Sequence, residues 1–160
     1  MAYVTDLPSF RLSRMPKKSY TYVDTSVWCA YCFNEKDSER AIDWLGNEDL
    51  SLVGTSWWTE TEFASALGIQ CRKKALTIGQ TRQARARFTD LLDMVTRLNV
   101  LEQDYLLASE YCMDSAHGLR GGDALHLAIA QRHGCTKVAT LDKEMQANAK
   151  RLGLKLIELK

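Results

Sequence analysis

The sequence predicts one α/β domain in which a parallel sheet of about five strands carries helices on both faces. Two observations predict it. Short apolar or β-branched runs alternate with helical stretches along the chain, and 160 residues are enough to bury a core of this kind. We expect the domain to cover residues 19–160. Residues 1–18 hold both prolines and no sustained hydrophobic period, so we expect an N-terminal extension there.

Five segments are expected to form the strands of the sheet. Each is rich in β-branched or apolar residues, and most are bounded by turn residues or by the start of a helix. They cover residues 20–23, 50–53, 99–101, 137–141 and 154–159.

Helices are expected in most of the intervals between these strands. Thr77-x-x-Gln80 has the form of a capping box, which places a helix start at Thr77. One face of that helix is predicted to hold Ala84, Phe88, Leu91, Val95 and Leu98, which recur at gaps of four and three. The other expected helices cover residues 27–33, a segment beginning at 37 or 38, 58–72, 104–116, 123–133 and 143–152.

Four carboxylates stand where predicted strands end or predicted helices begin. They are Asp24, Glu62, Asp123 and Asp142. In a parallel α/β sheet these positions meet at the carboxyl edge, where ligands bind. Carboxylates brought close together repel one another unless a cation lies among them, and oxygen ligands favour Mg²⁺ or Mn²⁺. The pattern therefore predicts a metal site suited to phosphate chemistry.

Three of these acids also have a purely structural interpretation. Asp123, which follows Gly-Gly, and Asp142 could each serve only as a helix cap. Asp24 suits that interpretation least, because a carboxylate between an apolar strand and an apolar helix is costly without a partner.

Two neighbours of the acids leave alternatives open. Glu60 competes with Glu62, which is favoured because it shares a helical face with Ala66 and precedes a phenylalanine. His126 lies three residues after Asp123, on nearly the same helical face. It either acts near a metal or is a buried, hydrogen-bonded histidine.

The segments around these acids resemble the four motifs of PIN-domain ribonucleases. They read Val-Asp24-Thr25-Ser26, Ser56-Trp-Trp-Thr-Glu-Thr-Glu62-Phe, Leu119-Arg-Gly-Gly-Asp123-Ala-Leu-His and Val138-Ala-Thr140-Leu-Asp142. They occur in the family's order and cover residues 20–160. In size the chain is similar to VapC-type toxins of toxin–antitoxin pairs, although such toxins usually begin almost at the first strand.

The resemblance implies a three-layer α/β/α domain that works as a metal-dependent endoribonuclease. Asp24, Asp123 and Asp142 would hold Mg²⁺ or Mn²⁺, which activates water for attack on phosphorus. Glu62 would complete the catalytic set as a proton acceptor. The residues expected to hold carboxylates or a metal-bound water in position are Thr25, Ser26 and Thr140. The implied partners are an RNA substrate, a small antitoxin and a second copy of the chain.

The balance of charge leaves any RNA contact to a local group of basic residues. The net charge is +1, with 21 basic and 20 acidic residues. Between Cys71 and Thr89 there are six basic residues and no acidic one, and they form either a solvated face or a contact to phosphates. The candidates are Arg72, Lys73, Lys74, Arg82, Arg85 and Arg87, with Arg120 beside Asp123. Trp57 and Trp58 could stack on bases or pack on the sheet.

The remaining features favour a cytoplasmic protein. Five scattered cysteines do not suit a disulfide framework, so we expect reduced thiols. No apolar run approaches the roughly 20 residues that span a bilayer. The alternative function is a non-catalytic PIN-fold module that binds RNA or supports assembly, and it would bind RNA without cleaving it.

Overall fold

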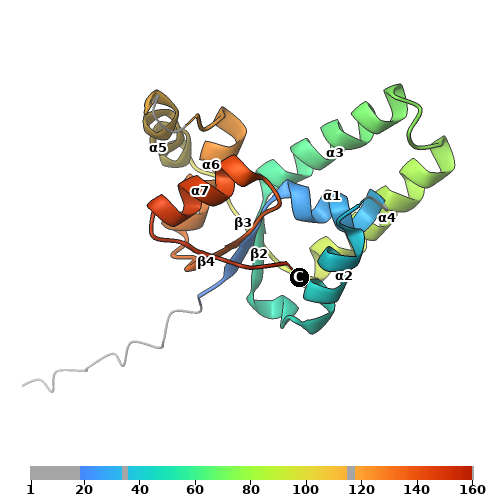
Figure 1. The fold of residues 1–160 in the computed structure, drawn as a ribbon, viewed down its shortest axis with the longest axis horizontal. Helices are drawn as coiled ribbons and strands as arrows, with labels where there is room; N and C mark the ends of the chain where they lie inside the picture. Colours follow the sequence, from blue (N-terminus) through green and yellow to red (C-terminus); the bar gives the residue numbers. More distant parts are fainter. Residues whose placement is uncertain (1–18, 34–35, 115–117, 160) are drawn as a thin grey trace, which may run out of the picture.

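The computed structural model describes residues 19–33, 36–114 and 118–159, so the expected N-terminal extension lies outside the described residues (Figure 1). A five-stranded sheet has the order β3-β2-β1-β4-β5, and every neighbouring pair is parallel. The strands are β1 (Thr21–Val23), β2 (Val53–Ser56), β3 (Thr96–Leu98), β4 (Lys137–Ala139) and β5 (Lys155–Leu156). One row of paired residues crosses the whole sheet, through Thr96, Gly54, Tyr22, Val138 and Leu156.

Helices cover both faces of the sheet, which confirms the three-layer α/β/α architecture (Figure 1). One layer holds α1 (Thr25–Phe33), α2 (Ser38–Asn47), α3 (Trp57–Arg72) and α4 (Ile78–Met94). The other holds α5 (Glu102–Met113), α6 (Gly121–Arg132) and α7 (Lys143–Arg151). The outer halves of α3 and α4 form a hairpin that projects beyond the sheet.

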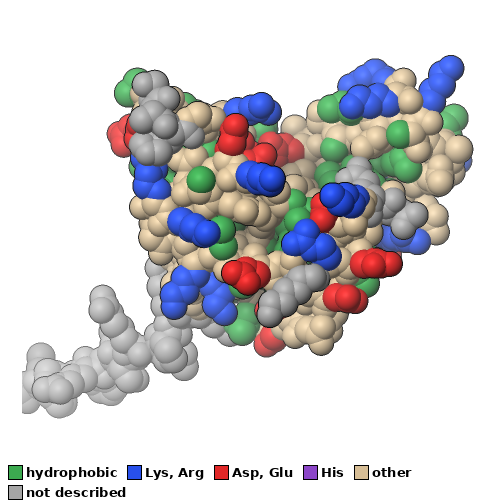
Figure 2. All heavy atoms as spheres, viewed as in Figure 1, with side chains coloured by type: hydrophobic (Ala, Val, Ile, Leu, Met, Phe, Trp, Pro, Cys, Tyr) green, Lys and Arg blue, Asp and Glu red, His purple; other side chains and the backbone are tan. Residues whose placement is uncertain are grey.

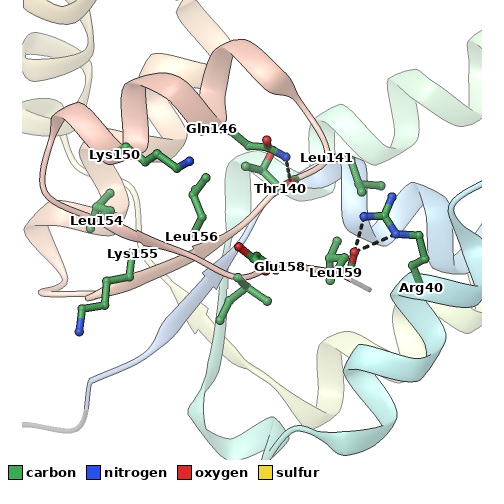
Figure 3. A pocket seen from close by; sticks show the side chains of 11 residues that line it. Arg40, Thr140, Leu141, Gln146, Lys150, Leu154, Lys155, Leu156, Glu158 and Leu159 are labelled. Atoms are coloured by element: carbon green, nitrogen blue, oxygen red, sulfur yellow. Dashed lines mark hydrogen bonds between the residues drawn. The ribbon is translucent and has the colours of Figure 1, made fainter.

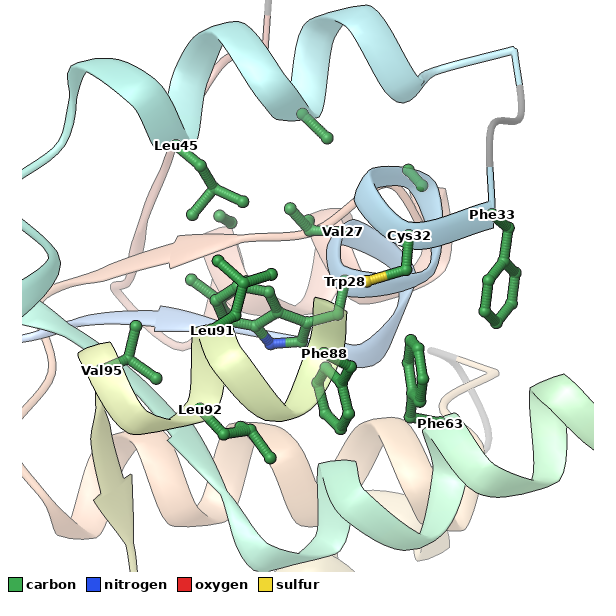
Figure 4. Close-up of a cluster of buried hydrophobic side chains, with 14 of the residues drawn as sticks. Val27, Trp28, Cys32, Phe33, Leu45, Phe63, Phe88, Leu91, Leu92 and Val95 are labelled. Carbon is green, nitrogen blue, oxygen red and sulfur yellow. The ribbon is translucent and has the colours of Figure 1, made fainter. Parts of the chain in front are cut away.

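The alternation of side chains along the strands produces two separate cores. Val23 faces a core that includes Phe63 and Phe88, whose rings stack with centroids 3.8 Å apart. Figure 4 shows this core, in which Trp28 of α1 packs against Phe88 of α4. Tyr22, the preceding residue, faces the second core between the sheet and α5–α7.

Two expected strands are displaced by local hydrogen bonding. Residues 50–52 form a 3-10 helix, η1 (Leu50–Leu52), because the Asp49 side chain accepts a bond from the Ser51 amide at 3.0 Å. The second strand therefore begins at Val53. The third strand is β3, three residues before the expected segment, and Leu98 belongs to it and not to the face of α4. The prediction extended too far because the spacing of apolar residues by four and three continues past Met94, where α4 ends.

Two side-chain interactions fix the ends of helices. The capping box at Thr77 is confirmed: its hydroxyl accepts from the Gln80 amide at 3.2 Å, and the Gln80 side chain accepts from the Thr77 amide at 2.9 Å. Asp104, at the start of α5, is 1% exposed and accepts two bonds from Arg132, at 2.6 and 2.9 Å. That bidentate pair joins α5 to α6.

No disulfide joins the five cysteines, which all lie within the described ranges. Within the described ranges, no helix has the length and apolar character needed to cross a bilayer.

Candidate active site

The predicted acids gather at the carboxyl edge of the central strands. The chain runs from β1 outward to β2 and β3, and then returns to β4 on the other side of β1. The direction of winding therefore changes between β1 and β4, which is where open α/β sheets bind ligands. Figure 2 shows acidic side chains gathered in the notch between α7 and the α3–α4 hairpin.

Asp24 follows β1 directly and is held by both of its carboxylate oxygens. One oxygen accepts from the Ser26 hydroxyl at 2.7 Å and the Ser26 amide at 3.1 Å. The other accepts from the Thr140 hydroxyl at 2.9 Å, across β1 and β4. Burial raises the pKa of Asp24, and His126 together with these hydrogen bonds opposes the rise. Thr140 and Ser26 therefore orient this carboxylate.

Asp123 lies in the first turn of α6, within the electrostatic reach of the other acids. Burial raises its pKa to about 6, and the charges of Asp142, Asp24 and Glu62 add to the rise while His126 opposes it. The four predicted acids therefore share one electrostatic environment.

Asp142 is both a member of this group and a helix cap. Its carboxylate accepts from the Met145 amide at 2.8 Å at the start of α7, and its own amide donates to the Thr140 hydroxyl at 3.1 Å. Asp142 thus caps α7, and a cap can still belong to the acidic group.

Glu60 and Glu62 point to different neighbours. Glu60 forms an ion pair with Arg85 of α4, which commits it to the α3–α4 hairpin. Glu62 Oε2 lies 2.5 Å from Thr25 Oγ1 and 2.5 Å from His126 Nε2. Burial alone would raise the pKa of Glu62, but the hydrogen bond and charge of His126, with Thr25, lower it.

A buried polar network continues behind Glu62. His126 is 1% exposed, and its Nδ1 lies 2.6 Å from the hydroxyl of Tyr22. That hydroxyl lies 2.9 Å from Ser56 Oγ. Tyr22 has no role in the sequence predictions. The available signal was its place two residues before Asp24, which puts both residues on one side of the strand.

Gly122 is a second contributor that the sequence predictions leave without a role. A Cβ atom at this position would lie 2.7 Å from Glu62 Oε1 and 3.6 Å from Trp58 Nε1. The distance to Glu62 leaves no room for a Cβ unless the carboxylate moves, whereas the distance to Trp58 is an ordinary van der Waals contact. The Gly-Gly pair before Asp123 was the signal in the sequence.

The basic residues predicted to contact RNA lie away from these acids, with the exception of Arg120. The exposed ones, which include Arg72, Lys73, Lys74, Arg82 and Arg87, lie at the end of α3, in the turn that follows it and on α4. Figure 2 shows blue side chains over the outer part of this hairpin. Arg85 is committed to Glu60 and to the Phe88 ring, 6.0 Å from its guanidinium carbon. Arg120 is exposed, three residues before Asp123.

The two tryptophans behave differently. Trp58 packs against the second core, as the packing alternative predicts. Trp57 is half exposed, and the Arg97 guanidinium lies 5.0 Å from its ring.

A groove of about 600 Å³ lies beside β5, and Thr140 separates it from Asp24 (Figure 3). Arg40 crosses one end of it and donates to the Leu159 carbonyl at 2.8 Å. Gln146 donates to the Thr140 carbonyl at 2.8 Å, while the Thr140 hydroxyl bonds Asp24. Thr140 is therefore held from both sides, which keeps its hydroxyl directed at the carboxylate.

The chemistry of the acidic group suits a divalent cation. Its donors are carboxylate and hydroxyl oxygens, the ligands of Mg²⁺ and Mn²⁺. The raised pKa of Asp123 reflects both burial and mutual repulsion, and a cation would relieve the repulsion. Among the residues that the structure describes, no group of three or more His, Cys, Asp and Glu side chains is arranged to hold a metal ion. The fit therefore rests on the donor types and their shared charge.

The chain is similar in fold to several solved structures. Mycobacterium tuberculosis VapC20, described as a sarcin-ricin loop cleaving toxin, aligns with a TM-score of 0.65 and 19% identity, over 80% of this chain and 94% of that one. FitAcB from Neisseria gonorrhoeae aligns with a TM-score of 0.65 and 19% identity, over 86% of this chain and 96% of that one. VapBC2 from Rickettsia felis, bound to a promoter DNA fragment, aligns with a TM-score of 0.59 and 13% identity, over 88% of this chain and 99% of that one. At these identities the likeness concerns the fold.

Comparison with curated proteins found no match. The family model described as the PIN domain matches residues 21–151, which is most of the chain. The match includes β1 to β4 and the four acidic positions at the carboxyl edge of the sheet. The chain therefore belongs to the PIN domain family.

Proposed function

We propose that this protein is a metal-dependent endoribonuclease that hydrolyses RNA phosphodiester bonds, and that it is the toxin of a VapBC-like pair. One observation carries the proposal: acids from four separate elements share a single electrostatic environment, in which burial and neighbouring carboxylates raise the pKa of Asp123 to about 6. Such an arrangement is costly to fold unless it serves a cation or a reaction.

The residues of the chain would divide the work as follows. Asp24, Asp123 and Asp142 would hold Mg²⁺ or Mn²⁺, which when bound supplies an activated water and offsets charge on the phosphate. Ser26 and Thr140 orient Asp24 by direct hydrogen bonds.

Glu62 would accept the proton of the attacking water. Its lowered pKa keeps the carboxylate ionised at neutral pH, and Thr25 with His126 directs one of its oxygens. A general base must be ionised and lie within hydrogen-bond reach of the proton that it takes.

The names of the structural neighbours support the biological part of the proposal. One neighbour is described as a toxin that cleaves the sarcin-ricin loop, and another as a toxin–antitoxin complex from Klebsiella pneumoniae. For this chain we infer an RNA substrate, a small antitoxin that neutralises it, and a cytoplasmic setting. The exposed apolar side chains of Tyr105, Leu106 and Met113 on α5 are the surface we assign to a homodimer contact.

The exposed basic residues of the hairpin would contact the RNA backbone. The candidates are Arg72, Lys73, Lys74 and Arg82, with Arg120 closer to the acids. Arg85 is the weakest member of the set because it is paired with Glu60. The affinity for RNA should fall as salt rises, since such contacts displace counterions.

The test is cleavage of total RNA by the purified full chain, with Mn²⁺, with Mg²⁺ and with EDTA, followed by mapping of the ends. We expect cleavage that needs the metal and is lost in Asp24→Asn and Asp123→Asn, while circular dichroism shows an intact fold. Cleavage that survives EDTA in both variants would refute the proposal. RNA binding without cleavage under every metal condition would favour the non-catalytic alternative.

A further inference from the structure

His126 is a polar side chain in an apolar setting. It is 1% exposed in α6, between Leu125 and Leu127, which both belong to the second core. An imidazole buried without partners would cost free energy of folding, so its two ring nitrogens need oxygen atoms nearby. The Tyr22 hydroxyl lies 2.6 Å from Nδ1, and Glu62 Oε2 lies 2.5 Å from Nε2.

The inner end of this arrangement is anchored in the sheet. Tyr22 is fully buried in β1, and burial raises the pKa of its hydroxyl, so the group stays neutral. The hydroxyl also bonds Ser56 at the end of β2. The Tyr22 and His126 rings meet edge to face, with centroids 5.6 Å apart. The imidazole is therefore fixed by two neighbouring strands.

The outer end of the arrangement is the Glu62 carboxylate. An ionised carboxylate only accepts hydrogen bonds, so the hydrogen between His126 Nε2 and Glu62 Oε2 is donated by the imidazole. The Thr25 hydroxyl donates to the same oxygen, and the other oxygen lies against Gly122. The carboxylate is thus held by α1 and α6, which are both outside its own helix.

We propose that His126 is a positioning residue for the cleavage reaction, because it transmits the fixed position of Tyr22 and Ser56 to the Glu62 carboxylate. The inference rests on the proposed function and extends it. Without the imidazole, the Glu62 side chain regains rotational freedom at the edge of the site. A misplacement of about 1 Å can cost on the order of 100-fold in rate, so we expect kcat to fall 10- to 100-fold with little change in KM.

A double-mutant cycle tests whether His126 acts through Glu62. His126→Leu should lower kcat strongly in the natural chain, but by less than about threefold in a Glu62→Gln background. His126→Gln keeps an N–H donor and should recover part of the activity. Equal losses in both backgrounds would show that His126 acts independently of Glu62 and would overturn the proposal.

The role of the Tyr22 hydroxyl is tested by a matched pair of variants. Tyr22→Phe removes the hydroxyl behind His126 and should lower kcat severalfold. Tyr111→Phe removes a hydroxyl that bonds Gln131 between α5 and α6, outside the site, and should leave kcat unchanged. Equal effects of the two substitutions would contradict the inference. If His126→Leu does not fold, His126→Gln and Tyr22→Phe carry the kinetic test.

A spectroscopic measurement separates this inference from the proposed function. In full-length protein with ¹⁵N-labelled histidine, Glu62→Gln should shift the ring nitrogens of His126 and leave those of His133 unchanged. His133 lies at the other end of α6 and bonds Asn99. If the protein cleaves no RNA, the proposed function fails and the spectrum still tests the network. An unchanged His126 spectrum would overturn the inference.

Discussion

Asp123→Asn should make the metal-free protein more stable while abolishing cleavage. Burial and the nearby carboxylates raise the pKa of Asp123 from 3.8 to about 6, so the ionised form is disfavoured in the folded state. That difference corresponds to about 3 kcal/mol, since one pKa unit is about 1.36 kcal/mol. Solvent screening of this partly exposed group reduces the figure to roughly 1–2 kcal/mol. An asparagine carries no charge and avoids this cost.

The effect should depend on pH in a defined direction. The folded protein holds the Asp123 proton more tightly than the unfolded chain does, so stability is lost as pH rises from about 4 to about 6. Above that range the full cost is present. The advantage of Asp123→Asn should therefore be near zero at pH 4 and greatest above pH 7.

Thermal unfolding in EDTA measures this advantage. At pH 7.5 the variant should melt about 2–8 °C above the natural chain, at about 2–4 °C per kcal/mol for a domain of this size. Asp90→Asn, at an exposed position on α4, is the matched control and should show no such difference. Added Mn²⁺ should stabilise the natural chain more than the variant. A variant that melts lower, or an advantage that is the same at pH 4.5 and 7.5, would refute this reasoning.

Two further substitutions test the packing around the site and in the scaffold. Gly122→Ala places a Cβ 2.7 Å from Glu62 Oε1 and should lower kcat about tenfold or more without unfolding the protein; Gly121→Ala, which has no atom within 4 Å, should be neutral in the same assay. Asp104→Ala leaves the Arg132 guanidinium without its buried partner and should cost about 3–5 kcal/mol in urea unfolding, so a loss below about 1 kcal/mol would contradict the role assigned to this pair.

The parts of the fold that follow from local patterns could be predicted from the sequence. The alternation of strands and helices predicted the parallel sheet with helices on both faces, and Thr77-x-x-Gln80 predicted a helix start within one residue. Prediction was wrong where the helical spacing of apolar residues ran on into a segment that forms a strand. The face predicted for α4 extended to Leu98, although the backbone leaves the helix after Met94 and Leu98 pairs within the sheet.

The candidate site divides in the same way. Strand ends and helix starts predicted that four acids would approach one edge, because sheet topology follows from the order of the elements. The sequence did not show which other groups each side chain would bond in the folded protein. Asp142 is a helix cap and also part of the acidic group, and Arg85 is paired with Glu60, so its guanidinium is not free for RNA.

The sequence by itself determined the fold class, the family resemblance and the positions of the acids, because each depends on residues close together in the chain. Only the tertiary structure showed that Glu60 pairs with Arg85 and Glu62 with His126, and only it joined Tyr22 to His126, 104 residues away. The physical reason is that a hydrogen bond depends on the distance between two atoms in space. No hydrophobic period records that distance for residues in different elements, so the polar network behind Glu62 becomes visible only once the sheet and its helices are assembled.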